Sequence, residues 1–263
     1  MEICVLTSGS CGNCIYVGNE QYSLVIDIGL SKTYFKKTLE CFGKNPKDIN
    51  AILLTHEHND HIRGVSDVPK TFDIPIYSTC GTWESIKFKR GKYYPENVNF
   101  FCCGDVFKVG DMTVESFKIS HDASDPVGYK ITDEFGKSVG IATDTGYVTD
   151  ETKKVITGSD VIILESNYDE DILLNGSYPW HLKMRVGGPK GHLSNKNCGM
   201  CLANIIKDNT KHVFLAHLSE NNNTPRIAFE TTRKILLSKG IVVGQDVDII
   251  TTKRYEMCKP III

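Results

Sequence analysis

The residues best suited to chemistry lie in one short stretch, Thr55 to His61, which reads Thr-His-Glu-His-Asn-Asp-His. Three histidines and two acids fall within six consecutive residues, directly after an apolar run at 49–54. Imidazole nitrogens and carboxylate oxygens are the usual ligands of zinc-like ions. A polar surface loop could carry these residues too, but ligand types this dense at the exit of a predicted strand favour a metal site.

The spacing within this stretch predicts two ions rather than one. His56 and His58 are two residues apart on an extended exit, so both can converge on the same ion. Asp60 and His61 begin the helix predicted to follow, and they point elsewhere. A single tetrahedral ion could not bind all four side chains and still keep a position open for water.

Further ligand types follow later apolar strands. His121 comes just after a strand ending at Ile119, Asp144 after the strand at 139–143, and His217 after the strand at 213–216. Each of these alone would more often be a turn residue or a histidine with an ordinary hydrogen bond. Because they recur at equivalent strand ends, where a sheet would deliver them to one common edge, we expect them to join the same site.

The elements that must position these side chains form two similar series. Strands are predicted at 2–7, 14–18, 22–27, 49–55, 74–78, 127–131, 139–143, 161–165, 212–216 and 247–251, with a hairpin over 100–119. Helices are predicted at 31–42, with Ser31 as N-cap, and at 61–71, 80–90, 150–157, 194–206 and 224–239, whereas 168–191 reads as a long loop. Both halves run from strands into helix–strand alternation, which predicts two packed sheets with helices outside them. The expected fold is α+β, a four-layer αββα sandwich forming a single domain over residues 1–263.

Composition excludes some classes of function. The chain has 263 residues, 24% of them charged, and a formal net charge of −2, which disfavours broad electrostatic binding but permits a local basic groove. Apolar runs are of strand length, and there is no secretory signal, so we expect no membrane association and a cytoplasmic location. Two cysteine pairs, Cys11/Cys14 and Cys198/Cys201, have the spacing of a four-sulfur zinc site, although buried inert cysteine is the simpler interpretation.

The motif His56-x-His58-x-Asp60-His61, with Asp27 upstream and His121, Asp144 and His217 downstream, resembles the metallo-β-lactamase superfamily. The resemblance spans residues 27–217 and implies the αββα fold. It implies one metal held by His56, His58 and His121, and another held by Asp60, His61 and His217, with the carboxylate of Asp144 bridging the two. Asp27 resembles the family's supporting acid, which orients ligands from behind, although a plain turn aspartate is the alternative. The histidine-rich set suits zinc, while bridging by a carboxylate also admits manganese or iron.

Three further segments resemble a narrower group, the YycJ/WalJ-type bacterial cytoplasmic proteins regarded as DNA exonucleases. They are 8–14 (Ser-Gly-Ser-Cys-Gly-Asn-Cys), 120–129 and 191–195; Cys11 departs from the serine expected there, with little consequence expected for the metal site because both side chains are small. Glu165 paired with His192 also resembles the arrangement in ribonuclease Z, in which a glutamate orients a histidine over the scissile phosphate. The resemblance favours a metal-dependent phosphodiesterase, a 5′-to-3′ DNA exonuclease using a hydroxide between two metals, with Asp60, Glu165 and His192 as catalytic residues.

The substrate is predicted from the segment before His192, which mixes aromatic and basic side chains. Such a mixture suits bases stacked on rings and phosphates held by cations. The candidate substrate-binding residues are Tyr178, Trp180, Lys183, Arg185, Lys190 and Ser194, although Ser194 also has the position of a helix N-cap. A second basic and aromatic stretch, 87–94, could extend the track or could be a solvated helix end.

Two alternatives stay open. A small-molecule hydrolase acting on a cyclic phosphodiester or a thioester, as glyoxalase II-like members do, could use the same metals. A metal-bound regulatory protein without turnover belongs to a different class, and the complete ligand set argues against it. The expected partner is nucleic acid, DNA rather than RNA.

Overall fold

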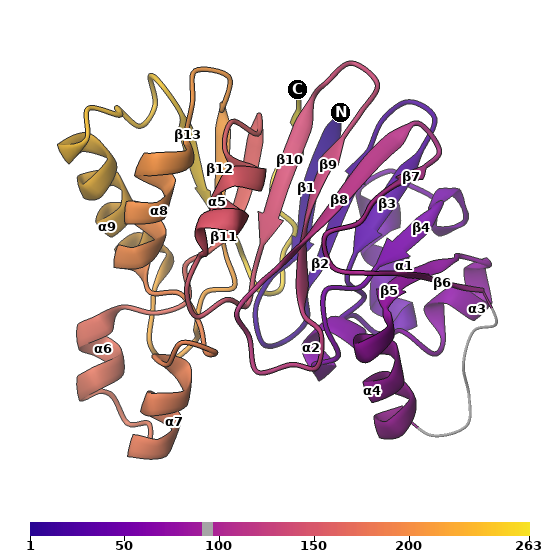
Figure 1. The fold of residues 1–263 in the computed structure, drawn as a ribbon, viewed down its shortest axis with the longest axis horizontal. Helices are drawn as coiled ribbons and strands as arrows, with labels where there is room; N and C mark the ends of the chain where they lie inside the picture. Colours follow the sequence, from indigo (N-terminus) through magenta and orange to yellow (C-terminus); the bar gives the residue numbers. More distant parts are fainter. Residues whose placement is uncertain (91–96) are drawn as a thin grey trace.

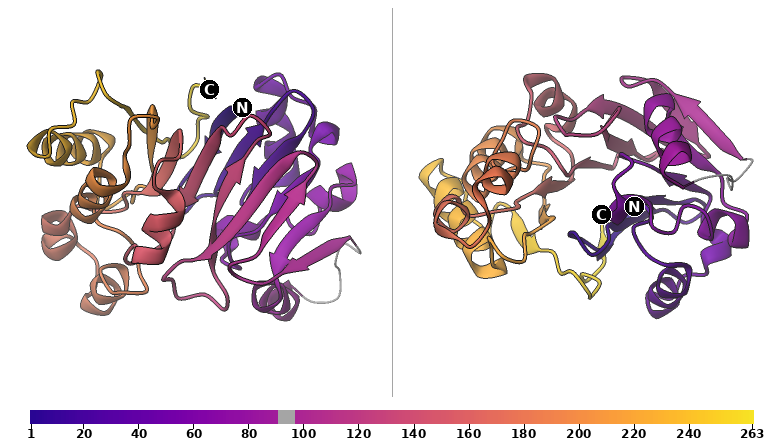
Figure 2. Two further views of the ribbon diagram at one scale, coloured as in Figure 1. Left: turned by 45° about the horizontal axis from the view of Figure 1, so that its top comes forward. Right: turned by 90° about the horizontal axis from the view of Figure 1, so that it is seen from below.

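The computed structural model describes residues 1–90 and 97–263, so part of the basic and aromatic stretch at 87–94 lies outside the described residues. Within the described ranges the strands form two seven-stranded sheets that face each other, with helices on both outer sides (Figure 1). The predicted four-layer αββα arrangement is confirmed. The same layers are visible from below and from a tilted direction in Figure 2.

The first sheet contains the N-terminal strands and one C-terminal strand. In spatial order, its strands are β14 (Ile261–Ile262), β1 (Glu2–Thr7), β2 (Cys14–Gly18), β3 (Ser23–Ile26), β4 (Ala51–Leu53), β5 (Ile76–Thr79) and β6 (Val98–Phe101). Pairing is antiparallel from β14 to β3 and parallel from β3 to β6. The helices of this half are α1 (Lys32–Cys41), the 3-10 helix η1 (Pro46–Asp48), α2 (Asn59–Ile62), α3 (Val68–Phe72) and α4 (Cys80–Arg90).

The second sheet repeats this plan. In spatial order, its strands are β13 (Asp248–Thr251), β12 (His212–Ala216), β11 (Val161–Glu165), β10 (Ser138–Ala142), β9 (Val127–Thr132), β8 (Met112–Lys118) and β7 (Val106–Val109). Pairing is antiparallel from β7 to β10 and parallel from β10 to β13. Its helices are α5 (Asp150–Ile156), α6 (Glu170–Asn175), α7 (Trp180–Val186), α8 (Asn195–Ile205) and α9 (Pro225–Ser238).

Three apolar clusters separate the four layers. One lies between the sheets and includes Tyr129 and Phe214, another lies under the helices of the first half, and the third lies under α5, α8 and α9. A sheet covered on both faces needs strands that are apolar throughout, which explains runs such as Val161–Glu165, where every residue is buried. With both faces covered, polar side chains gather at the strand ends, where the site is found.

Three predicted elements were wrong in detail. The helix expected over 61–71 is divided into α2 and α3. Between them the chain passes so close to Leu30 that a Cβ on Gly64 would lie 2.4 Å from the Leu30 carbonyl oxygen, which favours glycine there. The hairpin expected over 100–119 is confined to β7 and β8, since β6 pairs with β5 in the other sheet. The turn at Gly104 is therefore part of a crossover between sheets.

The third correction concerns 168–191, which was predicted to lack secondary structure. It contains two short helices, α6 and α7, which project below the second sheet in Figure 1. The Asp169 side chain caps α6 by accepting hydrogen bonds from the backbone of Asp171 and Ile172, and α7 begins after Pro179. Helix lengths of six and seven residues are too short to leave a clear periodic signal in the sequence.

Candidate active site

Three histidines from two sheets converge on one point, which we call the imidazole site. His56 and His58 leave β4, and His121 follows β8. His58 Nδ1 lies 3.1 Å from His56 Nε2 and 3.1 Å from His121 Nε2. Two nitrogens bound to one tetrahedral zinc at about 2.0–2.1 Å are roughly 3.3 Å apart, so this spacing suits three ligands of one ion.

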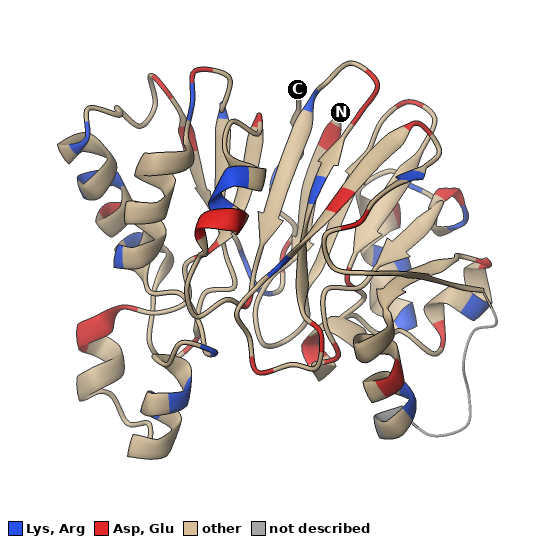
Figure 3. Cartoon of the chain, viewed as in Figure 1, with Lys and Arg blue, Asp and Glu red and all other residues tan. Residues whose placement is uncertain are grey.

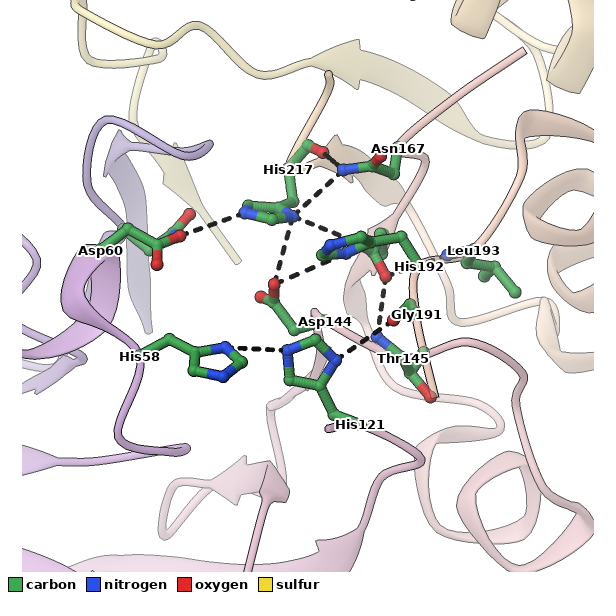
Figure 4. Close-up of polar contacts among 12 residues, drawn as sticks. His58, Asp60, His121, Asp144, Thr145, Asn167, Gly191, His192, Leu193 and His217 are labelled. Atoms are coloured by element: carbon green, nitrogen blue, oxygen red, sulfur yellow. Dashed lines mark hydrogen bonds and ion pairs between the residues drawn. The ribbon is translucent and has the colours of Figure 1, made fainter. Parts of the chain in front are cut away.

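Next to it lies a group that we call the mixed site, formed by Asp60, His61 and His217. Asp60 Oδ2 is 3.5 Å from His61 Nε2 and 3.4 Å from His217 Nε2. Asp60 and His61 belong to α2, whereas His217 follows β12 in the other sheet. Figure 4 shows Asp60 and His217 facing each other across the end of the sandwich.

Asp144 lies between the two sites. It follows β10, its Oδ2 is 3.2 Å from His61 Nε2, and it also belongs to a metal-capable group with His56. This Oδ2 is buried and has no hydrogen-bond partner among the described residues. A buried carboxylate needs positive charge beside it, and His61 is the charged neighbour of this oxygen. A carboxylate set among histidines from both halves is a donor set that fits divalent metal ions.

The outer nitrogen of each buried histidine faces an acceptor, which leaves the inner nitrogen free to bind an ion. His121 Nδ1 faces the Gly191 carbonyl oxygen at 3.1 Å, and His217 Nδ1 faces Glu165 Oε1 at 2.9 Å. His61 Nδ1 faces Asp27 Oδ2 at 2.7 Å. Such partners fix the tautomer and orientation of a metal-binding histidine.

Asp27 supports the first half of the site. Its carboxylate accepts hydrogen bonds from the backbone and hydroxyl groups of Thr55, both at 2.8 Å, besides facing His61. The Thr55 hydroxyl is also 2.9 Å from His56 Nδ1, so Asp27 supports one histidine of each site, the second through Thr55. Asp27 thus contacts side chains of the site beyond its own turn, which is compatible with the predicted supporting role.

Glu165 supports the side of the site that follows the second sheet, and it contacts more residues than the sequence indicated. Its Oε1 faces His192 Nδ1 at 2.7 Å as well as His217 Nδ1, while its Oε2 accepts from the backbone of Thr145 at 2.7 Å and Leu193 at 3.1 Å. The predicted pairing with His192 is present, and the same carboxylate also holds a residue of the mixed site.

The backbone at three site residues has an uncommon conformation. Asp27, Asp144 and His217 have φ values of 61°, 55° and 55°, in the left-handed region that non-glycine residues rarely occupy. All three follow the last residue of a buried strand directly or within two residues. Such strain persists where surrounding structure holds it, and it turns these side chains toward the common edge.

The electrostatics of the two sites differ. Burial and the neighbouring histidines hold the pKa of His56 well below its ordinary value, and burial likewise lowers the pKa of His58. Burial also lowers the pKa of His61 and of His217, but the surrounding carboxylates, Asp144 foremost, together outweigh it and raise both pKa values well above the ordinary value. Asp144 itself has a pKa well below its usual range because His217 and His61 outweigh its burial.

His192 faces the open side of the site. Residues of the imidazole site and of the mixed site line a pocket of about 350 Å³ together with His192 and Arg185. Burial lowers the pKa of His192, but Glu165 outweighs it and raises the pKa above the ordinary value, so this imidazole is prepared to carry a proton. Its side chain is 20% exposed, in contrast to the buried histidines behind it.

The predicted substrate-binding residues have different surroundings. Arg185 lines the pocket, and its Nε donates to Asp122 Oδ2 at 2.7 Å. Tyr178 lines an adjoining pocket of about 140 Å³ with His192 and His217. Trp180 and Lys190 are exposed, and Lys183 Nζ donates to the Leu174 carbonyl oxygen, joining α7 to α6. Figure 3 shows the cations along α7.

Ser194, like Trp180, Lys183 and Lys190, lies outside the linings of these two pockets. It is fully buried, accepts from the backbone of Asn197 as the N-cap of α8, and donates to Glu170 Oε1 at 3.0 Å. Its hydroxyl therefore has structural partners, and it lines neither pocket described above. The alternative interpretation, a helix cap, is the one that the geometry supports.

Sequence reasoning missed several residues of the site. Asn13 Nδ2 donates to Asp60 Oδ2 at 3.1 Å and lies 2.9 Å from His61 Nε2. Asn167 Nδ2 donates to the His217 carbonyl oxygen at 2.6 Å, and the Ser8 hydroxyl accepts from the His217 backbone at 2.8 Å. Ser8 and Asn13 belong to the predicted Gly/Ser turn, but nothing in their spacing indicated that they reach the mixed site.

The two cysteine pairs do not form one site. Cys14 packs under the helices of the first half, whereas Cys198 and Cys201 pack under those of the second. Among the described residues, no metal-capable group contains a cysteine. Cys11 Sγ lies 3.0 Å from the Tyr255 hydroxyl oxygen. Buried inert cysteine is therefore the interpretation that fits Cys14, Cys198 and Cys201.

Across the described ranges, no helix has the length and apolar character needed to cross a membrane. Residues 24–217 match a family described as the beta-lactamase superfamily domain. The chain is 38% identical over 249 residues to exodeoxyribonuclease YycJ of Bacillus anthracis, an alignment covering 95% of this chain and 94% of that protein. It is 35% identical over 250 residues to exodeoxyribonuclease WalJ of Streptococcus pneumoniae serotype 2, covering 94% and 93%.

A solved structure agrees with the fold. The metallo-β-lactamase fold protein YhfI from Bacillus subtilis aligns with a TM-score of 0.72 and 17% identity, covering 96% of this chain and 97% of that chain. At this identity the likeness concerns the fold alone, whereas the two curated relatives extend it to the sequence. The chain therefore belongs to the beta-lactamase superfamily of metal-dependent hydrolases, in the family that includes YycJ and WalJ.

Proposed function

We propose that this chain is a metal-dependent exodeoxyribonuclease that hydrolyses phosphodiester bonds of DNA from the 5′ end, with two zinc ions as the native cofactor. One observation carries the proposal: two metal-capable groups of side chains open into a single pocket that also contains a cation, Arg185, and a partly exposed imidazole, His192. The similarity to YycJ and WalJ, both named exodeoxyribonucleases, supports DNA as the substrate.

The proposed ligands are divided between the two sites. His56, His58 and His121 would hold one ion, Asp60, His61 and His217 the other, and Asp144 would bridge them. Two neighbouring divalent ions would lower the pKa of a water molecule between them and neutralise charge on the phosphate that is attacked. Because the ligands come from both sheets, we also propose that residues 1–263 act as one domain.

The residues of the chain contribute proton transfer and positioning. His192 is held by Glu165 and carries its proton on the side facing the pocket, so it can donate to a phosphate oxygen or protonate the leaving oxygen. Asp60 is ionised at neutral pH, because His61 and His217 lower its pKa against the effect of burial, so it can accept a hydrogen bond from the attacking water and orient that water for loss of its proton. Arg185 would pair with a phosphate at the mouth of the pocket.

The test is hydrolysis of double- and single-stranded DNA by metal-reconstituted protein, with RNA alongside and labels at either end of the strand. The matched control is the variant His56→Ala/Asp60→Ala, which removes one ligand from each site. Stepwise shortening from the 5′ end that the variant lacks is the expected result. Turnover of a small phosphodiester or a thioester, with no strand cut, would contradict the proposal and favour a small-molecule hydrolase.

A further inference from the structure

A second pocket adjoins the metal centre on the side away from α7. It has a volume of about 590 Å³, within the range of about 300–1,000 Å³ typical of small-ligand sites, and it is lined by Ser10, Tyr34, Arg63, Arg254 and Tyr255 among others. Ser10 also lines the pocket that holds both donor groups. The two pockets therefore share a wall, and a polymer leaving the metal centre past Ser10 enters this one.

The charge of this pocket is positive. Arg63 comes two residues after His61, is exposed, and makes no ion pair or hydrogen bond with other residues in the described part of the chain. Arg254 is held in place: it donates to the Leu218 carbonyl oxygen at 3.3 Å and pairs with Glu220 at 3.0 Å. None of the residues that line the pocket is acidic, so an anion meets two cations and no carboxylate on its walls.

The pocket also presents an aromatic face. Tyr255 is 64% exposed although its segment is well anchored, since its carbonyl oxygen accepts from the Tyr34 hydroxyl at 2.8 Å. The backbone of Ser8 donates to the Lys253 carbonyl oxygen at 3.2 Å, which ties the same segment to the turn beside the mixed site. A large ring held on a fixed backbone but left uncovered is the arrangement that base stacking uses.

We propose that this pocket binds one nucleotide of the DNA strand next to the bond being cut, with its phosphate on Arg63 and Arg254 and its base against Tyr255. The proposal rests on the proposed exodeoxyribonuclease function and adds a subsite to it. Cations that hold the backbone together with a ring that accepts any base are the recurring means of binding single strands without sequence preference. Of the two arginines, Arg63 is expected to contribute more to phosphate binding, because no carboxylate pairs with it as Glu220 pairs with Arg254.

The experiment measures binding of a labelled single-stranded DNA to the full-length, metal-loaded protein. A His192→Gln background slows cleavage of the strand during the binding measurement. Arg63→Ala and Tyr255→Ala are compared with Arg226→Ala, an exposed arginine of α9 outside the pocket. Arg63→Ala is expected to weaken binding about fivefold or more and to lower the slope of log affinity against log salt by about 0.7, the value for one phosphate contact on a single strand.

Tyr255→Ala is expected to weaken binding about fivefold or more, while Tyr255→Phe, which keeps the ring, binds like the parent protein. A strand carrying one abasic position identifies the nucleotide concerned. When the missing base is the one on Tyr255, Tyr255→Ala has no further effect, and this result also excludes a variant that has merely unfolded.

The outcomes separate the two proposals. If the wild type cuts DNA but Arg63→Ala binds the strand as tightly as Arg226→Ala does, the subsite is overturned and the nuclease stands. If binding depends on Arg63 and Tyr255 but no strand is cut, the subsite stands and the nuclease is overturned. Absence of binding by the parent protein overturns both.

Discussion

The imidazole site and the mixed site lie side by side but are prepared for a cation in opposite ways. In the imidazole site, burial and neighbouring histidines keep the pKa of His56 and of His58 low, so these ligands are neutral before any ion arrives. In the mixed site, Asp144 raises the pKa of His61 and of His217 against burial, so these ligands hold protons that an ion must displace. In the imidazole site, a cation meets neutral histidines. In the mixed site, protons on the histidines balance the charge of the carboxylates until a cation replaces them.

The two supporting carboxylates are placed differently with respect to these sites. Asp27 serves histidines only, through direct contact with His61 and through Thr55 to His56. Glu165 divides one oxygen between His217 in the mixed site and His192 in the pocket. Asp27 therefore contacts a histidine of each site, directly or through Thr55, whereas Glu165 joins one histidine of the mixed site to the histidine in the pocket.

The largest effect is expected when one proposed ligand is removed from each site, which tests whether the two sites bind metal independently. His56→Ala/Asp60→Ala is expected to abolish hydrolysis and to weaken metal binding strongly, because each site loses one of the three ligands that it does not share with the other. Each single variant is expected to keep one metal equivalent, measured by elemental analysis of the dialysed protein. If His56→Ala alone loses both metals, the sites are not independent, and the comparison fails.

The proton-transfer role of the second half is tested by His192→Gln. Removing a hydrogen-bond donor aimed at the reacting phosphate is expected to lower kcat about 10²–10³-fold, with the metal content unchanged. Both quantities are measured on one preparation, so that an altered fold shows itself as lost metal. Equal loss of metal and turnover would mean that His192 is a ligand or a structural residue.

The two supporting carboxylates give a smaller and more diagnostic effect. Asp27→Asn and Glu165→Gln keep the shape but remove the charge, and such changes behind metal ligands cost about 10–100-fold in metal affinity or activity. Asp27→Asn is expected to act on metal affinity, measured with a competing chelator. Glu165→Gln is expected to lower kcat further at saturating metal, and identical behaviour of the two variants would contradict the coupling assigned to Glu165.

The smallest effect is on the pH dependence of metal affinity. His61 and His217 keep their protons until the pH rises above the ordinary histidine value, so metal binding at neutral pH releases protons from the mixed site. Affinity there should rise with pH, by up to about tenfold per unit for each proton displaced, and fall on acidification. Calorimetry in buffers of different ionisation enthalpy counts the protons, and the Asp60→Ala variant, with the imidazole site intact, should release fewer.

The sequence alone predicted the candidate ligands that the structure brings together, because their spacing is local or tied to strand ends. Four candidate ligands fall within six residues after a buried strand, so their side chains must stay close together. His121, Asp144 and His217 each follow an apolar run that must end at a sheet edge. The two-sheet sandwich could be predicted for the same reason, since strands apolar throughout require cover on both faces. Short helices, such as α6 and α7, carry too little periodicity to be recognised.

The tertiary structure decided everything that depends on contacts between distant segments. Asn13 reaches Asp60, Glu165 holds two histidines, and Tyr255 stands beside Ser10 only because the register of both sheets brings those segments together. No spacing in the sequence encodes these meetings, since each joins residues tens to hundreds of positions apart. The left-handed backbone at Asp27, Asp144 and His217 has the same origin, because only surrounding packing holds a non-glycine residue in that conformation.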